Sequence, residues 1–195
     1  MSACSSSVQT KNDSRPAQAV QNGIQQHKAI VDIPEAYNEK LKGLETVKGK
    51  VIHIKDGDTI DVNVNGQKQT VRLLLLDTPE SVSQKIPPKK MGKEASSFLK
   101  KQLKGKNVTI VYDGGPKQDK YGRKLAYVFC EGIHINELMI KSGYGIVAYI
   151  SKPNITLLPQ MLESEKEAKA SKTGVWNIKG YVDEEKHHYN RNDAA

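Results

Sequence analysis

Residues 47–80 read VKGKVIHIKDGDTIDVNVNGQKQTVRLLLLDTPE, and the apolar pattern of this stretch decides the fold. Apolar and polar residues alternate through its first half, as they do in strands with one covered face. Asn65-Gly66 is a two-residue hairpin signal, and the apolar run after it is typical of a central strand covered on both faces. The stretch therefore predicts a three-stranded meander, with strands at 47–54, 59–64 and 70–76.

Two more strands and three helices are predicted after the meander. Apolar residues at helical spacing indicate a first helix ending near Gly105, a second stopping at Gly143, and a third over 158–171. Strand patterns occupy 107–112 and 124–130. Five strands with helices packed outside them favour a mainly β fold with some α, namely an OB-fold five-stranded β-barrel with three helices.

The two ends of the chain differ from this middle. Residues 1–28 are rich in Ser and Gln and poor in large apolar side chains, so burial cannot offset their ordering entropy. We therefore expect 1–42 to be a disordered N-terminal tail or tether, with a short helix around 36–41. The folded domain is expected over 43–180, and 181–195 is expected to be a polar C-terminal tail.

The two cysteines carry separate expectations. Cys4 and Cys130 lie far apart in the sequence, so no disulfide framework is predicted. Cys130 follows a strand-like run and is expected to be a small buried hydrophobe. No signal peptide is recognisable, yet Ser2-Ala3-Cys4 resembles the end of a bacterial lipoprotein signal. We expect a secreted or surface-anchored protein, attached to a membrane only through a lipidated Cys4.

Charge is concentrated in the middle of the chain. The 195 residues carry a net charge of +8, and residues 43–180 alone carry +9. Such a domain raises the local concentration of polyanions, which favours DNA or RNA as a partner. The alternative is an ordinary basic protein that binds no particular polyanion. No run approaches the roughly 18 apolar residues that a membrane-spanning helix needs.

Four carboxylates lie where predicted strands begin or end, at Asp56, Asp58, Asp77 and Glu80. Like charges so placed raise one another's pKa unless a cation neutralises them. Neither Cys nor His accompanies them, so the ligands are hard oxygens that suit calcium or magnesium. An EF-hand is excluded because the positions of its third ligand, its glycine and its closing glutamate hold Ile60, Asp61 and Gln67.

Two arginines accompany these carboxylates. Arg72 lies in an otherwise apolar strand, and an unpaired buried guanidinium is costly, so Arg72 needs an anion. That anion is either a structural carboxylate or a substrate phosphate, which the planar guanidinium can bind through two hydrogen bonds. Arg123, in a Tyr-Gly-Arg turn before the fifth strand, is a second candidate.

From about Val47 to Trp176 the sequence resembles the staphylococcal nuclease (thermonuclease) family. The resemblance rests on four motifs in family order, which are Asp-Gly-Asp-Thr at 56–59, Arg-Leu-Leu-Leu-x-Asp-Thr-Pro-Glu at 72–80, Asp-Lys-Tyr-Gly-Arg-x-Leu-Ala-Tyr at 119–127, and Val-Ala-Tyr with Lys-Pro-Asn at 147–154. Ser151 departs from the pattern, since the best-known relatives carry an aromatic residue there. The family's OB-like barrel agrees with the predicted strands.

The resemblance also implies an activity and the residues that perform it. The activity is a calcium-dependent, micrococcal-type endo- and exonuclease that hydrolyses DNA and RNA to 3′-phosphorylated products with little sequence specificity. Ca²⁺ would be held by Asp58, Asp77 and the backbone carbonyl of Thr78, with Asp56 acting through water. The catalytic residues would be Arg72, Glu80 and Arg123, with Glu80 as general base or positioner of the water. The nucleotide would be bound by Lys120, Tyr121 and Tyr149.

Two other functions remain open at this point. The first is an OB-fold protein that binds nucleic acid without cleaving it, although such domains usually lack the acidic and arginine residues found here. The second is a calcium-binding envelope protein with no enzymatic role. No protein partner is implied, and the chain is expected to be a monomer.

Overall fold

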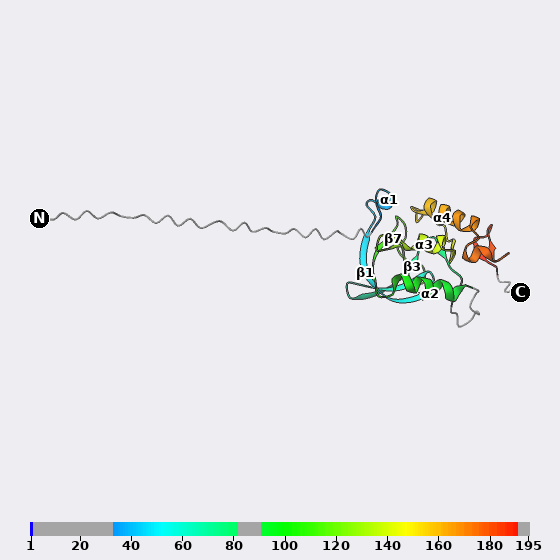
Figure 1. The fold of residues 1–195 in the computed structure, drawn as a ribbon, viewed down its shortest axis with the longest axis horizontal. Helices are drawn as coiled ribbons and strands as arrows, with labels where there is room; N and C mark the ends of the chain where they lie inside the picture. Colours follow the sequence, from blue (N-terminus) through cyan, green and yellow to red (C-terminus); the bar gives the residue numbers. More distant parts are fainter. Residues whose placement is uncertain (2–32, 82–90, 191–195) are drawn as a thin grey trace.

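A five-stranded β-barrel forms the centre of this protein in a computed structural model, which describes residues 1, 33–81 and 91–190. The strands are β1 (Thr46–Asp56), β2 (Thr59–Val64), β3 (Gln67–Leu73), β5 (Asn107–Val111) and β6 (Lys124–Cys130). Their order is β3-β2-β1-β5-β6, and the parallel pairing of β3 with β6 closes the barrel (Figure 1). This is the predicted OB-type barrel, with the predicted meander as its first three strands.

The apolar run at 70–76 is not one strand, which corrects the predicted third strand. β3 ends at Leu73, and Leu75 adopts a left-handed conformation with φ 58°. The chain then re-enters extended structure as β4 (Leu76–Asp77), which pairs with β8 (Ile146–Val147) instead of with the barrel. The leucines of both pieces are buried, and after the bend Asp77 lies opposite Ile146 of β8.

A buried asparagine fixes the bend. Asn136 is fully buried, and its Nδ2 donates to the carbonyl oxygens of Leu74 at 3.0 Å and Ala126 at 3.2 Å. Its Oδ1 accepts the amide of Val128 at 3.0 Å. One side chain therefore satisfies backbone groups of the bend and of β6, where water does not reach.

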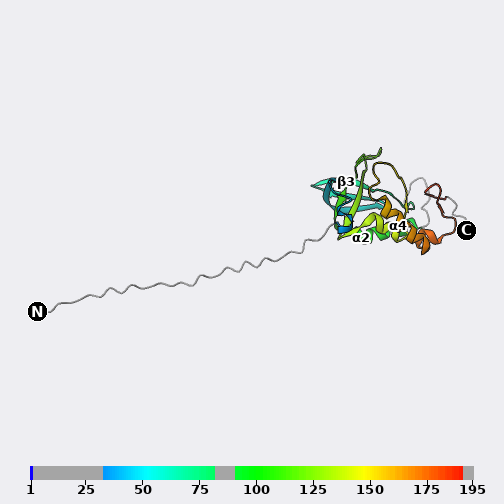
Figure 2. The ribbon, with the colours of Figure 1, turned by 90° about the horizontal axis from the view of Figure 1, so that it is seen from above.

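Four α-helices surround the barrel, namely the three predicted for the domain and a short one at the start, close to the helix expected around 36–41. They are α1 (Glu35–Asn38), α2 (Gly92–Leu103), α3 (Ile135–Lys141) and α4 (Leu158–Ala170), followed by the 3₁₀ helix η1 (Gly174–Asn177). In Figure 2, β3 lies along the upper edge of the barrel, with α2 and α4 below it. Leu99 and Leu103 of α2 are completely buried, so the predicted apolar face does cover the core. No helix in the described part of the chain is both long and apolar enough to cross a membrane.

The folded body extends beyond the expected limits of 43–180. Ahead of it, Leu41 is buried in the core, and Tyr37 of α1 packs edge-on against Phe129 and donates a hydrogen bond to Glu137. Residues 33–42 are thus folded, whereas Cys4 and the rest of the expected tail at 2–32 lie outside the described residues. Cys130 is 3% exposed, as expected.

The expected polar tail at 181–195 is wrong for its first ten residues. β9 (Val182–Asp183) and β10 (His188–Tyr189) pair as a hairpin. Tyr181 and Tyr189 are buried in a second apolar cluster with Ile146, Ala148 and Val175. Polar residues dominate this segment, but its two tyrosines carry enough apolar surface to dock it.

We expect Asn136→Ala to destabilise the protein by about 3 kcal/mol, because buried backbone groups would lose their partner. Urea unfolding of the purified protein measures the loss. Asn63→Ala is the matched control, since Asn63 only accepts the exposed amide of Gly66 in the β2–β3 turn. Equal losses for the two variants would contradict the role given to Asn136.

Candidate active site

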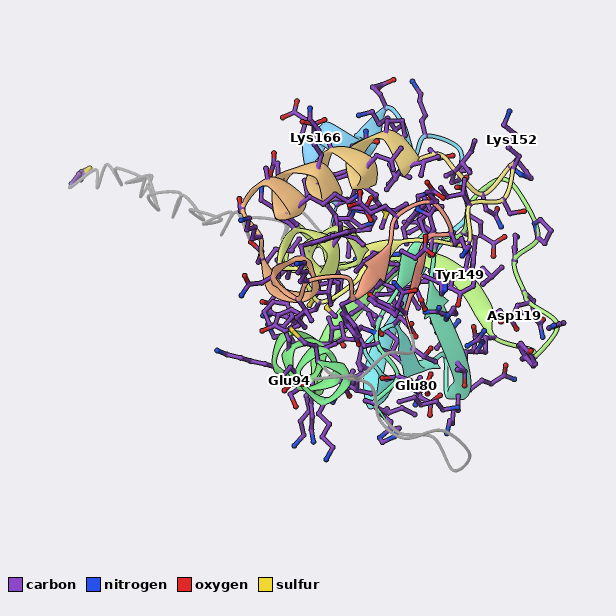
Figure 3. The ribbon with its side chains drawn as sticks, turned by 90° about the vertical axis from the view of Figure 1, so that its right-hand side faces the viewer. Glu80, Glu94, Asp119, Tyr149, Lys152 and Lys166 are labelled. Carbon is purple, nitrogen blue, oxygen red and sulfur yellow. The ribbon has the colours of Figure 1, made fainter. Side chains whose placement is uncertain are left out.

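A cleft of about 980 Å³ opens between one end of the barrel and the segments that follow β4, β5 and β8. Nine of the ten predicted site residues line it, and these are Asp56, Asp58, Arg72, Asp77, Glu80, Lys120, Tyr121, Arg123 and Tyr149. The tenth, Thr78, is buried directly behind Asp58. In Figure 3 the labels of Glu80, Asp119 and Tyr149 lie around this face, whereas Glu94 and Lys166 lie on helices away from it.

The innermost wall of the cleft is a charged cluster built around Arg72. Its guanidinium forms an ion pair with Asp58 and a second one, at 3.4 Å, with Oδ1 of Asp77. All three side chains are at least four-fifths buried, so the anion that the sequence required for Arg72 is a pair of carboxylates. Burial lowers the pKa of Arg72, but Asp58 and then Asp77 more than reverse this effect, and the pKa lies above its ordinary value.

Asp58 is held from several directions. Its Oδ1 accepts the hydroxyl of Thr59 at 2.8 Å, and its Oδ2 accepts the amide and hydroxyl of Thr78 at 3.3 and 3.2 Å. Gly57 allows this approach, because a Cβ at that position would lie 2.6 Å from Oγ1 of Thr78. The β1–β2 turn and the residues after β4 are therefore locked together at Asp58.

Glu80 occupies the mouth of the cleft. Partial burial, the negative charge of Asp56 and a hydrogen bond to it, and then the charges of Asp58 and Asp77, raise the pKa of Glu80 to about 7. Gly92, at the start of α2, packs against the backbone here, since a Cβ on it would lie 2.3 Å from the carbonyl oxygen of Glu80. A carboxylate with this pKa can accept or return a proton near neutral pH.

The donor set fits a hard divalent cation. Asp56, Asp58, Asp77 and Glu80 give four carboxylates against one buried guanidinium, and burial together with the charges of the other three acids raises the pKa of Glu80. Within residues 33–81 and 91–190, no three Asp, Glu, His or Cys side chains are arranged to hold a metal by themselves. An ion bound here would thus take the remaining oxygens from backbone, water or substrate, as Ca²⁺ and Mg²⁺ commonly do.

Arg123 reaches the cleft from the segment just before β6. Because β3 and β6 pair in parallel, with Val71 opposite Lys124, this arginine lies beside the strand that carries Arg72. Its Nε donates to Oδ2 of Asp119 at 2.7 Å, and its guanidinium stacks 5.4 Å from the ring centre of Tyr121. Two guanidinium groups therefore face one cleft, one of them buried and the other about one-third exposed.

Two exposed tyrosines line the outer part of the cleft. Tyr149 is 69% exposed and Tyr121 is 71% exposed. The guanidinium of Arg72 lies 5.2 Å from the ring centre of Tyr149, whose hydroxyl donates to Oδ1 of Asp77 at 3.3 Å. Nζ of Lys120 lies 5.1 Å from the ring centre of Tyr121. Exposed aromatic faces beside cations are suited to bases and phosphates.

Asp119 opens the motif at 119–127, but the sequence-based prediction assigns it no role. Its Oδ1 accepts the amides of Tyr121 and Arg123 at 2.9 and 3.0 Å, and its Oδ2 holds the guanidinium of Arg123. Asp119 therefore shapes the turn that carries Tyr121 and Arg123. An Asp side chain can accept the backbone amide two residues further on and so form a turn. That signal could have revealed Asp119 in the sequence Asp-Lys-Tyr.

Tyr189 contacts the site but is not among the residues predicted from the sequence. Its hydroxyl donates to the backbone carbonyl of Asp77 at 2.9 Å, which ties the C-terminal hairpin to the charged cluster. The tyrosine is 1% exposed, and burial is the main reason that its pKa lies well above the ordinary value. Nothing in the composition of residues 181–195 points to the cleft, because the contact spans 112 positions in the sequence.

Comparison with known proteins agrees with this geometry. A family model described as staphylococcal nuclease homologue matches residues 70–178. An uncharacterized protein of Bacillus anthracis is 84% identical over 198 residues, covering all of this chain and 92% of the relative. Endonuclease YncB of Bacillus subtilis is 35% identical, covering 93% of this chain and 88% of its own length. The thermonuclease of Staphylococcus hyicus is 38% identical, covering 66% and 75%.

We expect Tyr189→Phe to lower the free energy of unfolding by about 1 kcal/mol through loss of its hydrogen bond. It should also speed amide hydrogen exchange in residues 76–78, which the hairpin ties down. Tyr144→Phe is the control, because the Tyr144 ring packs on Phe98 at 4.5 Å, away from the charged cluster. Unchanged exchange at 76–78 in Tyr189→Phe would contradict the link to Asp77.

Proposed function

This chain belongs to the staphylococcal nuclease family, and from that premise we propose that it is a calcium-dependent phosphodiesterase acting on DNA and RNA. The proposed products carry 3′-phosphates, and sequence specificity is slight because the cleft offers contacts for phosphates and base faces. One observation carries the proposal. Arg72, Asp58 and Asp77 form a buried charged cluster in the same cleft as Arg123 and a glutamate whose pKa is about 7.

The two arginines bind and stabilise the phosphate. Each guanidinium can donate two hydrogen bonds to one phosphate, and donors aimed at developing charge contribute about 10²–10³ in rate each. Asp58 and Asp77 fix the position of Arg72, and Asp119 does the same for Arg123. Both arginine side chains are therefore in place before the substrate arrives, and phosphate binding requires little reorganisation.

Glu80 acts on the attacking water. It accepts or orients the proton of a water molecule that attacks phosphorus in line with the departing 5′-oxygen, so the 3′ side keeps the phosphate. The raised pKa makes Glu80 a stronger base than an ordinary glutamate while leaving it partly ionised at neutral pH.

Asp58, Asp77 and the backbone carbonyl of Thr78 are the proposed calcium ligands, with Asp56 acting through water. When bound, Ca²⁺ supplies positive charge that offsets the negative charge of the phosphate. Such a cation would offset the negative charge of the cluster, because Arg72 pairs with Asp58 and Asp77 while Glu80 lies among further negative charges.

Tyr121, Tyr149 and Lys120 are proposed to hold the nucleotide. The aromatic rings offer stacking surfaces of no particular base preference, and Lys120 offers a charge to a phosphate. Ser151 also lines the cleft and adds no ring to this surface. Unpaired strands should accordingly be better substrates than stable duplexes.

We also propose that the protein is a secreted or surface-anchored monomer. The support for export is Ser2-Ala3-Cys4, which resembles a lipoprotein signal end, and the lipid would be attached to Cys4.

A protein that only binds nucleic acid is the alternative. It would not explain why a glutamate with a pKa of about 7 shares one cleft with two arginines.

The proposed function is tested by incubating the protein with DNA in Ca²⁺ and in excess chelator. Acid-soluble nucleotides should appear only with Ca²⁺, and mass spectrometry of the products should find 3′-phosphates. Binding without release of nucleotides would favour the alternative, and 5′-phosphates would show that the other phosphorus–oxygen bond breaks.

We expect Glu80→Gln to keep DNA binding and to lose about 10²–10⁴ in cleavage rate, the contribution of a general base. Without a bound cation, the Glu80 carboxyl has a pKa of about 7 and is therefore about half protonated at pH 7. A bound cation favours the ionised form, so calcium binding should release about half a proton per protein. Calcium affinity should therefore weaken as the pH falls below 7, and Glu80→Gln should abolish that pH dependence.

Calorimetry in buffers of different ionisation enthalpy measures the released protons. Glu94→Gln is the control, because Glu94 lies in the first turn of α2 and does not line the cleft. Equal losses of binding and cleavage in Glu80→Gln would show instead that Glu80 is structural.

A further inference from the structure

A second groove, of about 470 Å³, adjoins the catalytic cleft. The two cavities share Lys55, Thr70, Tyr121 and Arg123, so they are continuous. Beyond the shared residues, the groove is lined by Lys68 of β3 and Lys124 at the start of β6. The channel is thus bordered by Lys55, Lys68, Lys124 and Arg123. It begins near Tyr121 and leads away from Arg72.

A buried carboxylate fixes two of these lysines. Asp61 of β2 has a side chain 1% exposed, and its oxygens lie 2.8 Å from Nζ of Lys68 and 3.4 Å from Nζ of Lys55. The hydroxyl of Thr70 donates to Asp61 at 2.6 Å and accepts from Lys55 at 3.2 Å. Burial would raise the pKa of Asp61, but its contacts with Lys68, Thr70 and Lys55 lower it, so Asp61 is ionised.

The lysines keep part of their donors turned to solvent. The side chains of Lys55 and Lys68 are 45% and 61% exposed, and each ammonium has three donors. Lys124 is similarly placed, with its Nζ donating to Gln118 at 3.3 Å. One buried carboxylate therefore orients ammonium groups that still have hydrogen bonds to give to an anion.

Strand geometry separates this groove from the reacting phosphate. Lys68, Thr70 and Arg72 alternate along β3 and so lie on one face, with Lys68 about 13 Å along the strand from Arg72. A phosphate at Lys68 is thus a different group from the one at Arg72. A single nucleic-acid strand carries such phosphates at regular intervals, whereas a free phosphate ion has no reason to follow the channel.

We propose that the groove of Lys55, Lys68 and Lys124 is a subsite for a backbone phosphate of the substrate strand, beyond the nucleotide held at Tyr121. This inference rests on the proposed function and adds a length preference to it. Strands long enough to enter the groove bind more tightly than a dinucleotide, while the chemical step is the same for both. Asp61 is the positioning residue of this subsite.

The test compares Lys68→Gln/Lys124→Gln with the intact protein. The probe is a fluorescent 12-nucleotide DNA strand, and its Kd is measured by anisotropy in chelator, where no cleavage is needed. We expect Kd to rise about five- to tenfold, and the slope of log Kd against log salt to fall by about 0.7 for each phosphate that the variant no longer neutralises. With Ca²⁺, KM for the 12-nucleotide strand should rise while kcat stays unchanged, and dinucleotide kinetics should stay within about twofold.

Two controls isolate the site. Lys101→Gln/Lys166→Gln makes the same charge change on α2 and α4, at residues that line neither cavity, and should leave Kd unchanged. Lys68→Arg/Lys124→Arg should restore tight binding. If the two glutamine pairs weakened DNA binding equally, net charge alone would explain the effect, and the proposal would be overturned. Inorganic phosphate bound at Arg72 and Arg123 would displace the strand from both proteins alike. Stronger displacement by phosphate than by chloride at equal ionic strength, seen in the intact protein but absent from Lys68→Gln/Lys124→Gln, would overturn the proposal in favour of a free-anion site in the groove.

Failure of this inference and failure of the proposed function give different results. If the intact protein cleaves DNA but the 12-nucleotide Kd does not depend on Lys68 and Lys124, the subsite is wrong and the nuclease assignment stands. If Kd depends on the lysines but no nucleotides are released with Ca²⁺, the groove is supported and the catalytic assignment fails.

Discussion

The rest of this structure depends on the burial of one guanidinium between two carboxylates. Arg72 leaves β3 inside the protein, and a buried charge without partners would cost several kcal/mol. Asp58 from the β1–β2 turn and Asp77 from β4 supply the partners, so three segments must converge at one point. The fold and the site are therefore one arrangement, because the β1–β2 turn, β3 and β4 must all be in place for these charges to meet.

The same arrangement gathers acids at the inner end of the cleft. Arg72 pairs with Asp58 and Asp77, while burial and the negative charge of Asp56 and then of Asp58 and Asp77 raise the pKa of Glu80. A protein selected only for stability would remove such a cluster, since like charges destabilise the folded state. Under the proposed function, a bound cation would offset the charge of this cluster. Neighbouring Asp61 shows the opposite situation, in which lysines satisfy a buried carboxylate and its pKa falls.

Much of the fold could be predicted from sequence because local patterns encode it, and most of the cleft because its residues lie in four motifs that resemble those of the family. The strands at 59–64 and 124–130 were placed to the residue, since their alternation is clear and turn residues bound them. The split of 70–76 could not be seen, because a run of leucines looks the same in one buried strand as in two. Its bend is set by Asn136, more than sixty residues away, and by the pairing of β4 with β8.

The sequence by itself determined the five strands, the meander that the first three form and the chemical types in the cleft, since periodicity, turn residues and clustered charges are local properties. Only the tertiary structure decided which groups meet. It pairs Arg72 with Asp58 and Asp77, assigns Asp119 to Arg123, and brings Tyr189 to the carbonyl of Asp77. Such contacts depend on the closure of the barrel and on where buried polar groups find partners. These are properties of the whole chain, and no segment carries them alone.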